Sequence, residues 1–151
     1  MLNDVYKTLR NRFIAICVVL LVLLLATFLY HRSNMDHLTR AGYALTMVCF
    51  FGSAIFSACI PIIIRLLTFK KVKDDGNISK KSYLNFKRLV SISAFVGALF
   101  AIYGYYAMIY GALLTVTILF AMYGIYSIIP SKKAVNMELV EFNVEDYNNK
   151  K

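Results

Sequence analysis

The chain has 151 residues, of which 60% are hydrophobic, and its 17 Lys and Arg against 8 Asp and Glu give a formal net charge of +9. That apolar fraction is more than a water-soluble domain of this size can bury, so lipid must cover part of the surface. The basic residues flank apolar stretches instead of forming a separate domain, which indicates anionic lipid head groups and not nucleic acid as their counter-charge.

The first apolar stretch, residues 13–30, follows Lys7, Arg10 and Arg12. A cleavable signal peptide begins in the same way, but this stretch ends at Tyr30 and His31 without the small residues of a cleavage site. At about 1.5 Å per residue, it is long enough to cross the hydrocarbon core of a bilayer. We expect a retained transmembrane helix.

A second helix is expected over residues 41–67. It is longer than a perpendicular span requires, so we expect it to tilt or to kink at Pro61, which has no backbone N–H. A basic loop should follow over residues 68–87, with a turn at Gly76. The candidate contacts of this loop with anionic lipid are Lys70, Lys71, Lys73, Lys80 and Lys81.

No charged residue occurs between Arg88 and Lys132, a segment far too long for one span. We therefore expect two helices, over about residues 87–106 and 111–129, joined by a short turn near residues 106–111. Pro130 should stop the last helix.

The distribution of charge predicts the orientation. With four spans, 15 of the 17 Lys and Arg lie on one side and only Arg32 and Arg40 on the other. The positive-inside rule then places both termini in the cytoplasm. The predicted fold is an all-α membrane protein, a four-helix transmembrane bundle over residues 1–130, in an integral membrane location that we take to be a bacterial inner membrane.

Residues 131–151 form an acidic tail that holds Glu138, Glu141, Glu145 and Asp146. Residues 140–145 alternate between apolar and polar, which would suit a short docked strand, but we favour a frayed and solvated end. On the cytoplasmic side, the tail would compete with lipid for the lysines of the basic loop.

Small side chains recur every three or four residues along the predicted helices. Such ridges allow helix backbones to approach closely in a membrane, so we interpret them as packing faces within or between protomers, with a ligand groove as the alternative. The candidate packing residues are Ser53, Ser57, Gly97, Ala101, Gly104, Ala121 and Gly124.

The sequence contains no catalytic constellation. No Asp, Glu, Lys, Arg or His lies in the middle of a predicted span, where proton-coupled and ion-coupled transporters usually carry one. His31, His37 and Asp36 fall in one loop, but two histidines without a third firm ligand are weak evidence for a metal. We expect no enzyme activity, no cofactor and no metal.

The predicted function is that of a small membrane interaction or accessory subunit, in a homo-oligomer or a larger complex. It would assemble through the small-residue faces, and its basic loop would contact anionic lipid or an acidic partner. The alternative is a transporter, a lipid-handling protein or a holin-like or channel-like pore. A transport path should show a cavity lined by residues such as Ser53, Ser57, Thr115 and Thr117, whereas a scaffold should pack these groups against helices.

Overall fold

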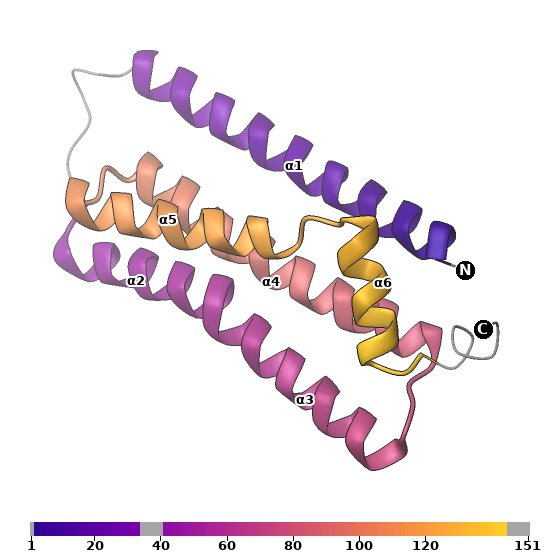
Figure 1. Ribbon diagram of the computed structural model, residues 1–151. Helices are drawn as coiled ribbons and strands as arrows, with labels where there is room; N and C mark the ends of the chain where they lie inside the picture. The colour runs from indigo at the N-terminus through magenta and orange to yellow at the C-terminus, as the bar shows by residue number, and fades with distance from the viewer. Residues whose placement is uncertain (1, 34–40, 145–151) are drawn as a thin grey trace.

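The computed structural model describes residues 2–33 and 41–144, and every regular element in these ranges is helical. The elements are α1 (Leu2–Ser33), α2 (Tyr43–Ala54), the π-helix η2 (Ile55–Cys59), α3 (Ile60–Asp75), α4 (Lys80–Tyr106), α5 (Gly111–Ser127) and α6 (Lys132–Glu141). Figure 1 shows α2, η2 and α3 as one rod, with α4 and α5 beside it, α1 along the outer side and α6 across one end.

Three helical segments are long and apolar enough to cross a membrane: α1, the rod of α2, η2 and α3, and α4. The pair of α5 and α6 makes a fourth if it is counted as one span, although it bends by 74° at the break. By helix length and composition, the chain is therefore compatible with an integral membrane protein.

The helices extend further than expected at the lysine-rich end. We expected a loop over residues 68–87, but α3 continues to Asp75 and α4 begins at Lys80. Gly76 ends α3 with φ of 78°, in the left-handed region that glycine adopts readily, and the Ser79 side chain caps α4 by accepting from the Ser82 N–H. The basic loop is thus a helical hairpin with a short turn, because lysine is a good helix former and both ends are capped.

Pro61 alters the rod one turn before its own position. The Ile60 N–H bonds to the Ile55 carbonyl in the wider π register, and Pro61 has no N–H to donate to the next carbonyl, that of Phe56. The Ser93 hydroxyl of α4 donates to the Phe56 carbonyl instead. A side chain of the neighbouring helix therefore satisfies a carbonyl that the proline leaves without a backbone donor.

The rod meets α4 and α5 where both present glycine. A Cβ added at Gly97 would overlap the Ser57 hydroxyl and lie 3.0 Å from the Ser57 backbone nitrogen. A Cβ added at Gly124 would lie 2.9 Å from the Ser57 Cβ. Nearby, the fully buried Ser53 donates to the Thr117 carbonyl over 3.0 Å. Small residues and helix-to-helix hydrogen bonds thus hold these three elements together.

The connection from α4 to α5 has the expected position, since α4 ends at Tyr106 and α5 begins at Gly111. Met108 adopts φ of 50°, and the Ile109 N–H returns to the Gly104 carbonyl over 3.2 Å. The Ile109 side chain is buried, and its Cδ1 would lie 3.0 Å from a Cβ at Gly104. Gly104 therefore leaves room for the turn to fold back on the end of α4.

Gly97→Ala should destabilise the protein by about 1–3 kcal/mol, because the new methyl group overlaps Ser57 and meets its backbone. Gly111→Ala is the matched control, since nothing lies within 4 Å of a Cβ there. Thermal unfolding in detergent measures both. Alanine ordinarily favours a helix over glycine, so an equal or raised midpoint for Gly97→Ala would contradict the close contact.

Candidate functional site

The seven candidate packing residues lie in two places. Ser53, Ser57, Gly97, Gly104 and Gly124 lie inside the contacts that join the rod to α4 and α5 within one chain. The Ser57 hydroxyl is buried and has no hydrogen-bond partner among the described residues. These five residues therefore lie within helix contacts and do not line an opening.

Ala101 and Ala121 instead lie on the floor of an apolar groove of about 520 Å³ between α1, α4 and α5. We call it the α1–α5 groove. Its lining consists of Leu20, Leu21, Leu24, Phe28, Ala98, Ala101, Ile102, Tyr105, Ile118, Ala121, Met122 and Ile125. The floor is made of small residues and the walls of large ones, and Tyr105 alone carries a polar group.

The groove exists because α1 packs along only part of its length. Its buried residues are Val5, Leu9 and Leu20, and none of the described residues after Leu20 in this helix is buried. Near its end, the His31 ring stacks on Tyr105 with centroids 4.8 Å apart, and Nε2 lies 3.1 Å from the Tyr106 carbonyl oxygen. His37 and Asp36 lie outside the described residues.

The tail differs most from expectation, because residues 132–141 form α6 and dock on the bundle instead of fraying. Pro130 precedes the helix, and the Ser131 side chain caps it by accepting from the Ala134 N–H over 3.0 Å. Val135 and Leu139 are buried one turn apart. Beyond α6, Val144 forms an isolated bridge with Ile78, where the sequence alternation suggested a strand.

Around α6 lies a second core, made of buried side chains from three helices, α1, α4 and α6, from the turn between α3 and α4, and from the segment after α6. We call it the end cap. Its buried members are Val5, Leu9, Ile78, Tyr83, Phe86, Val90, Val135, Leu139, Phe142 and Val144. The Phe142 ring packs 5.1 Å from that of Phe69 and 5.3 Å from that of Phe86, centroid to centroid.

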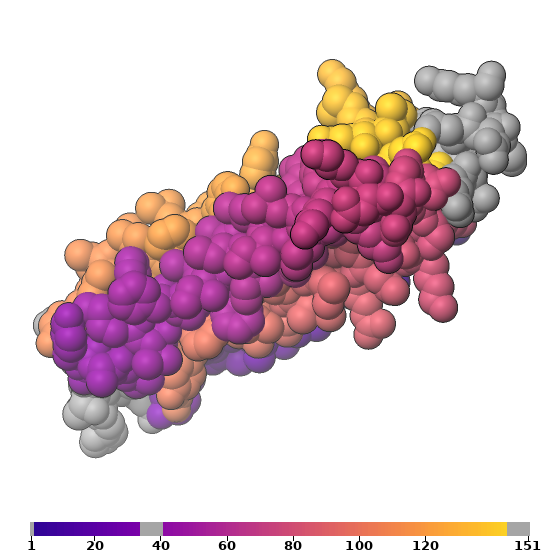
Figure 2. All heavy atoms as spheres, turned by 90° about the horizontal axis from the view of Figure 1, so that it is seen from below, coloured from indigo at the N-terminus to yellow at the C-terminus, as the bar shows by residue number. Residues whose placement is uncertain are grey.

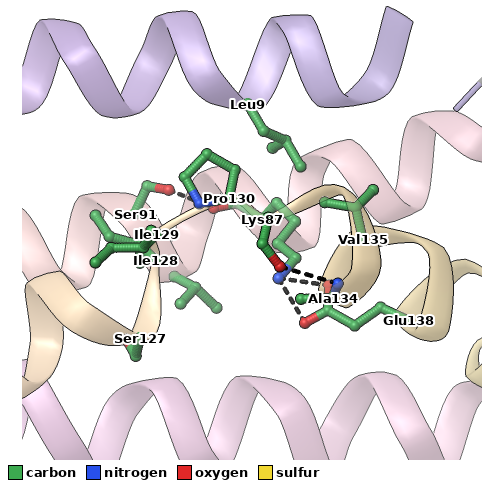
Figure 3. Close-up of a pocket in the computed structure, with 12 residues that line it drawn as sticks. Leu9, Lys87, Ser91, Ser127, Ile128, Ile129, Pro130, Ala134, Val135 and Glu138 are labelled. Atoms are coloured by element: carbon green, nitrogen blue, oxygen red, sulfur yellow. Dashed lines mark hydrogen bonds and ion pairs between the residues drawn. The ribbon is translucent and has the colours of Figure 1, made fainter. Parts of the chain in front are cut away.

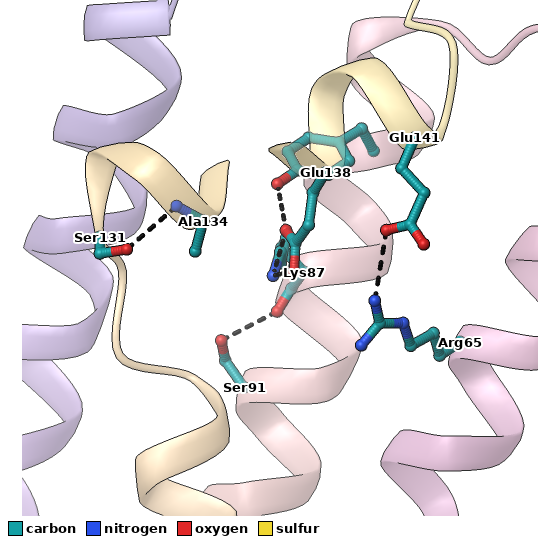
Figure 4. Close-up of polar contacts among 8 residues, drawn as sticks. Arg65, Lys87, Ser91, Ser131, Ala134, Glu138 and Glu141 are labelled. Carbon is teal, nitrogen blue, oxygen red and sulfur yellow. Dashed lines mark hydrogen bonds and ion pairs between the residues drawn. The ribbon is translucent and has the colours of Figure 1, made fainter. Parts of the chain in front are cut away.

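Glu138 is the polar centre of the end cap. Its carboxylate accepts from the Tyr83 hydroxyl over 2.7 Å. Its two oxygens lie 2.6 and 2.7 Å from the Lys87 ammonium (Figures 3 and 4). Both charged side chains are about a fifth exposed, at 18% for Lys87 and 19% for Glu138. They border a cavity of about 70 Å³ beneath the link from α5 to α6, large enough for ordered water.

A second ion pair joins the tail to α3. Arg65 Nη2 lies 3.3 Å from Glu141 Oε2, with the two side chains 52% and 41% exposed. The tail therefore engages Lys87 and Arg65 and leaves the five lysines that we singled out free of ion pairs within residues 2–33 and 41–144. Lys70, Lys71 and Lys73 lie on the last turns of α3, and Lys80 and Lys81 on the first turn of α4.

Sequence reasoning missed the end cap, although part of its signal was present. Ser131 directly after Pro130 is a helix-start pattern, and Val135 and Leu139 have the spacing of one buried helical face. Tyr83 is fully buried, and its hydroxyl donates to Glu138. Nothing in the sequence alone pairs Tyr83 with a residue on a distant helix.

Comparisons with protein-family models, with curated proteins and with solved structures found no match to this chain. No relative therefore supplies a function. Two surfaces of the molecule are open to a partner, the α1–α5 groove and the basic end.

Glu138→Ala should destabilise the protein by about 2–3 kcal/mol, because it leaves the poorly exposed Lys87 ammonium and Tyr83 hydroxyl without their partner. Glu141→Ala, one turn along the same helix, should cost at most about 1 kcal/mol, since its pair is exposed. Denaturant unfolding in detergent compares the two. Equal losses would show that the Glu138 cluster does not hold the end cap together.

Proposed function

We propose that the protein is a small integral membrane interaction or accessory subunit, a four-helix transmembrane bundle with both termini in the cytoplasm. The topology is supported by charge: apart from Arg32, every described Lys and Arg lies on segments that meet at the α6 end of the molecule. An end rich in Lys and Arg faces the cytoplasm under the positive-inside rule. The same bias is typical of insertion into a bacterial inner membrane, the compartment that we propose.

The observation that carries the functional proposal is the contrast between the packed polar groups and the open apolar groove. Ser53, Ser57 and Thr117 are fully buried between helices. A transport path would instead need these polar groups on the wall of a cavity. The α1–α5 groove is instead almost wholly apolar, with Ala98, Ala101 and Ala121 as its floor. Small residues beside large apolar ones favour the approach of another helix in a membrane.

The small-residue faces thus divide between two roles in this proposal. Those that face the rod hold the helices of one chain together. Those at the floor of the α1–α5 groove receive an apolar helix from a second copy or from a larger complex. No cofactor and no catalytic step is involved. A lipid-handling role would use the same groove for an acyl chain, and the experiments below distinguish the two occupants.

Topology reporters test the orientation. A reporter active only in the cytoplasm should work when fused after Lys151, because the positive-inside rule places the Lys- and Arg-rich end of the molecule, which carries α6, in the cytoplasm. One active only outside should work when inserted among residues 34–40, between α1 and α2. Cytoplasmic activity from an insertion there would exclude the four-span arrangement.

Photo-crosslinking tests the groove. A photoreactive amino acid in place of Met122, which is 61% exposed and lines the groove, should form an adduct with a protein helix. The same residue in place of Ile63, 53% exposed and outside the groove, should not form that adduct. Purified protein in liposomes reports a second copy, and native membranes report a larger complex.

A pair of neighbouring leucines supplies the matched control. Leu24→Trp should fill the groove and abolish the Met122 adduct, whereas Leu25→Trp, at similar exposure but outside the lining, should leave it intact. Both variants should keep the thermal midpoint of the parent protein. Adducts of Met122 with lipid alone would reject the interaction-subunit proposal in favour of the lipid-handling alternative.

A further inference from the structure

We propose that a second groove, between α3 and α4, binds one anionic phospholipid of the cytoplasmic leaflet. The inference deepens the proposed function, since it rests on a membrane in which the α6 end faces the cytoplasm. The groove has a volume of about 350 Å³ and lies on the helical hairpin that carries the five lysines without an ion pair in the described part of the chain. Figure 2 shows α3 and the start of α4 side by side at this end of the molecule.

The lining of the α3–α4 groove changes from polar to apolar along both helices. On α3 it passes from Lys71 to Leu67 and then to Ile64. On α4, which runs in the opposite direction, it passes from Ser82 to Asn85 and then to Leu89. Both series descend by about 10 Å from the hairpin turn toward the middle of the bundle.

This change from polar to apolar matches a phospholipid, which has a charged head group at one end and apolar acyl chains at the other. The upper part offers an ammonium, a hydroxyl and an amide to a phosphate oxygen, from Lys71, Ser82 and Asn85. The lower part offers Leu67 and Leu89, which are 63% and 53% exposed, to an acyl chain. Thr68 adds no polar group to the lower part, because its hydroxyl donates to the Ile64 carbonyl of its own helix.

Charge favours an anionic head group. Lys71 forms no ion pair with any residue in the described ranges, and no Asp or Glu lines the groove. The acidic residues of α6 engage Lys87 and Arg65 instead, so this part of the tail leaves Lys71 available. A basic residue at the leaflet surface attracts anionic lipid by about 1 kcal/mol.

A lipid fits the groove better than an acidic protein segment. An acidic segment in the cytoplasm could reach Lys71 and Ser82 at the top, but not the apolar wall at Leu67 and Leu89 that lies deeper along the helices. Only a molecule with a charged head and an apolar chain contacts both parts. The occupant of the α3–α4 groove is therefore a phospholipid.

Native mass spectrometry of the full-length protein in neutral detergent tests this binding, with dioleoyl phosphatidylglycerol as the probe and dioleoyl phosphatidylcholine as the neutral comparison. We expect one phosphatidylglycerol to be retained in preference to phosphatidylcholine. Lys71→Gln should weaken the retention by about fivefold, the equivalent of the attraction of one lysine. Equal retention of the two lipids by the parent protein would overturn the proposal.

Lys70→Gln is the matched control, because Lys70 is the exposed neighbour of Lys71 but does not line the groove. It should leave the retention close to that of the parent protein. An equal loss in both variants would show a diffuse attraction to the basic end and reject the α3–α4 groove. Thermal midpoints of both variants should match that of the parent, since neither lysine is buried.

Two further probes separate the lipid from other anions. Glycerol phosphate, which has the head group without the chains, should fail to displace phosphatidylglycerol at equal concentration. A hexaglutamate peptide should bind no more weakly to Lys71→Gln than to the parent protein. Displacement by glycerol phosphate, or peptide binding that depends on Lys71, would replace the lipid site with a phosphate site or an acidic-protein site. The result is independent of crosslinking at Met122, which probes the α1–α5 groove.

Discussion

The close approach of the rod, α4 and α5 at Ser57 is the contact on which the packing of these elements depends, and with it the α1–α5 groove. Gly97 and Gly124 have no Cβ, so α4 and α5 both reach the backbone of the rod at this point. There is little room left between them, and Ser53, Ser57 and Thr117 are fully buried. Because α4 and α5 are drawn toward the rod, α1 packs mainly on α4 and α6 among the described residues, and the α1–α5 groove stays open.

The two halves of the molecule use different kinds of packing. Between the rod, α4 and α5, the buried side chains are small, and van der Waals contact and hydrogen bonds replace the hydrophobic effect, as lipid offers no drive for apolar burial. The end cap is built from Tyr83, Phe86, Leu139 and Phe142, like the core of a soluble protein. Since Val5 and Leu9 belong to it, the end cap also sets the position of α1.

The features predictable from the sequence were those encoded locally. The apolar stretches, the turn between Tyr106 and Gly111 and the small-residue faces all follow from composition and spacing. The helical hairpin around Gly76 was missed, because clustered lysines were read as a loop although Gly76 and Ser79 are ordinary helix caps. The Glu138 cluster and the two grooves depend on distances between helices remote in the chain, and no local pattern carries that information.

The π-helix has a consequence for how the chain tolerates change in length. It holds one residue more than a regular helical path of the same rise, so deleting one residue between Ile55 and Cys59 would restore an ordinary helix. The parts of the rod on either side would then keep their phase, because the wider π turn takes up the extra residue. Arg65 would still face Glu141, and Lys71 would still line the α3–α4 groove. Deleting one residue from the first turn of α3 would instead turn everything after it by about 100° and break both contacts.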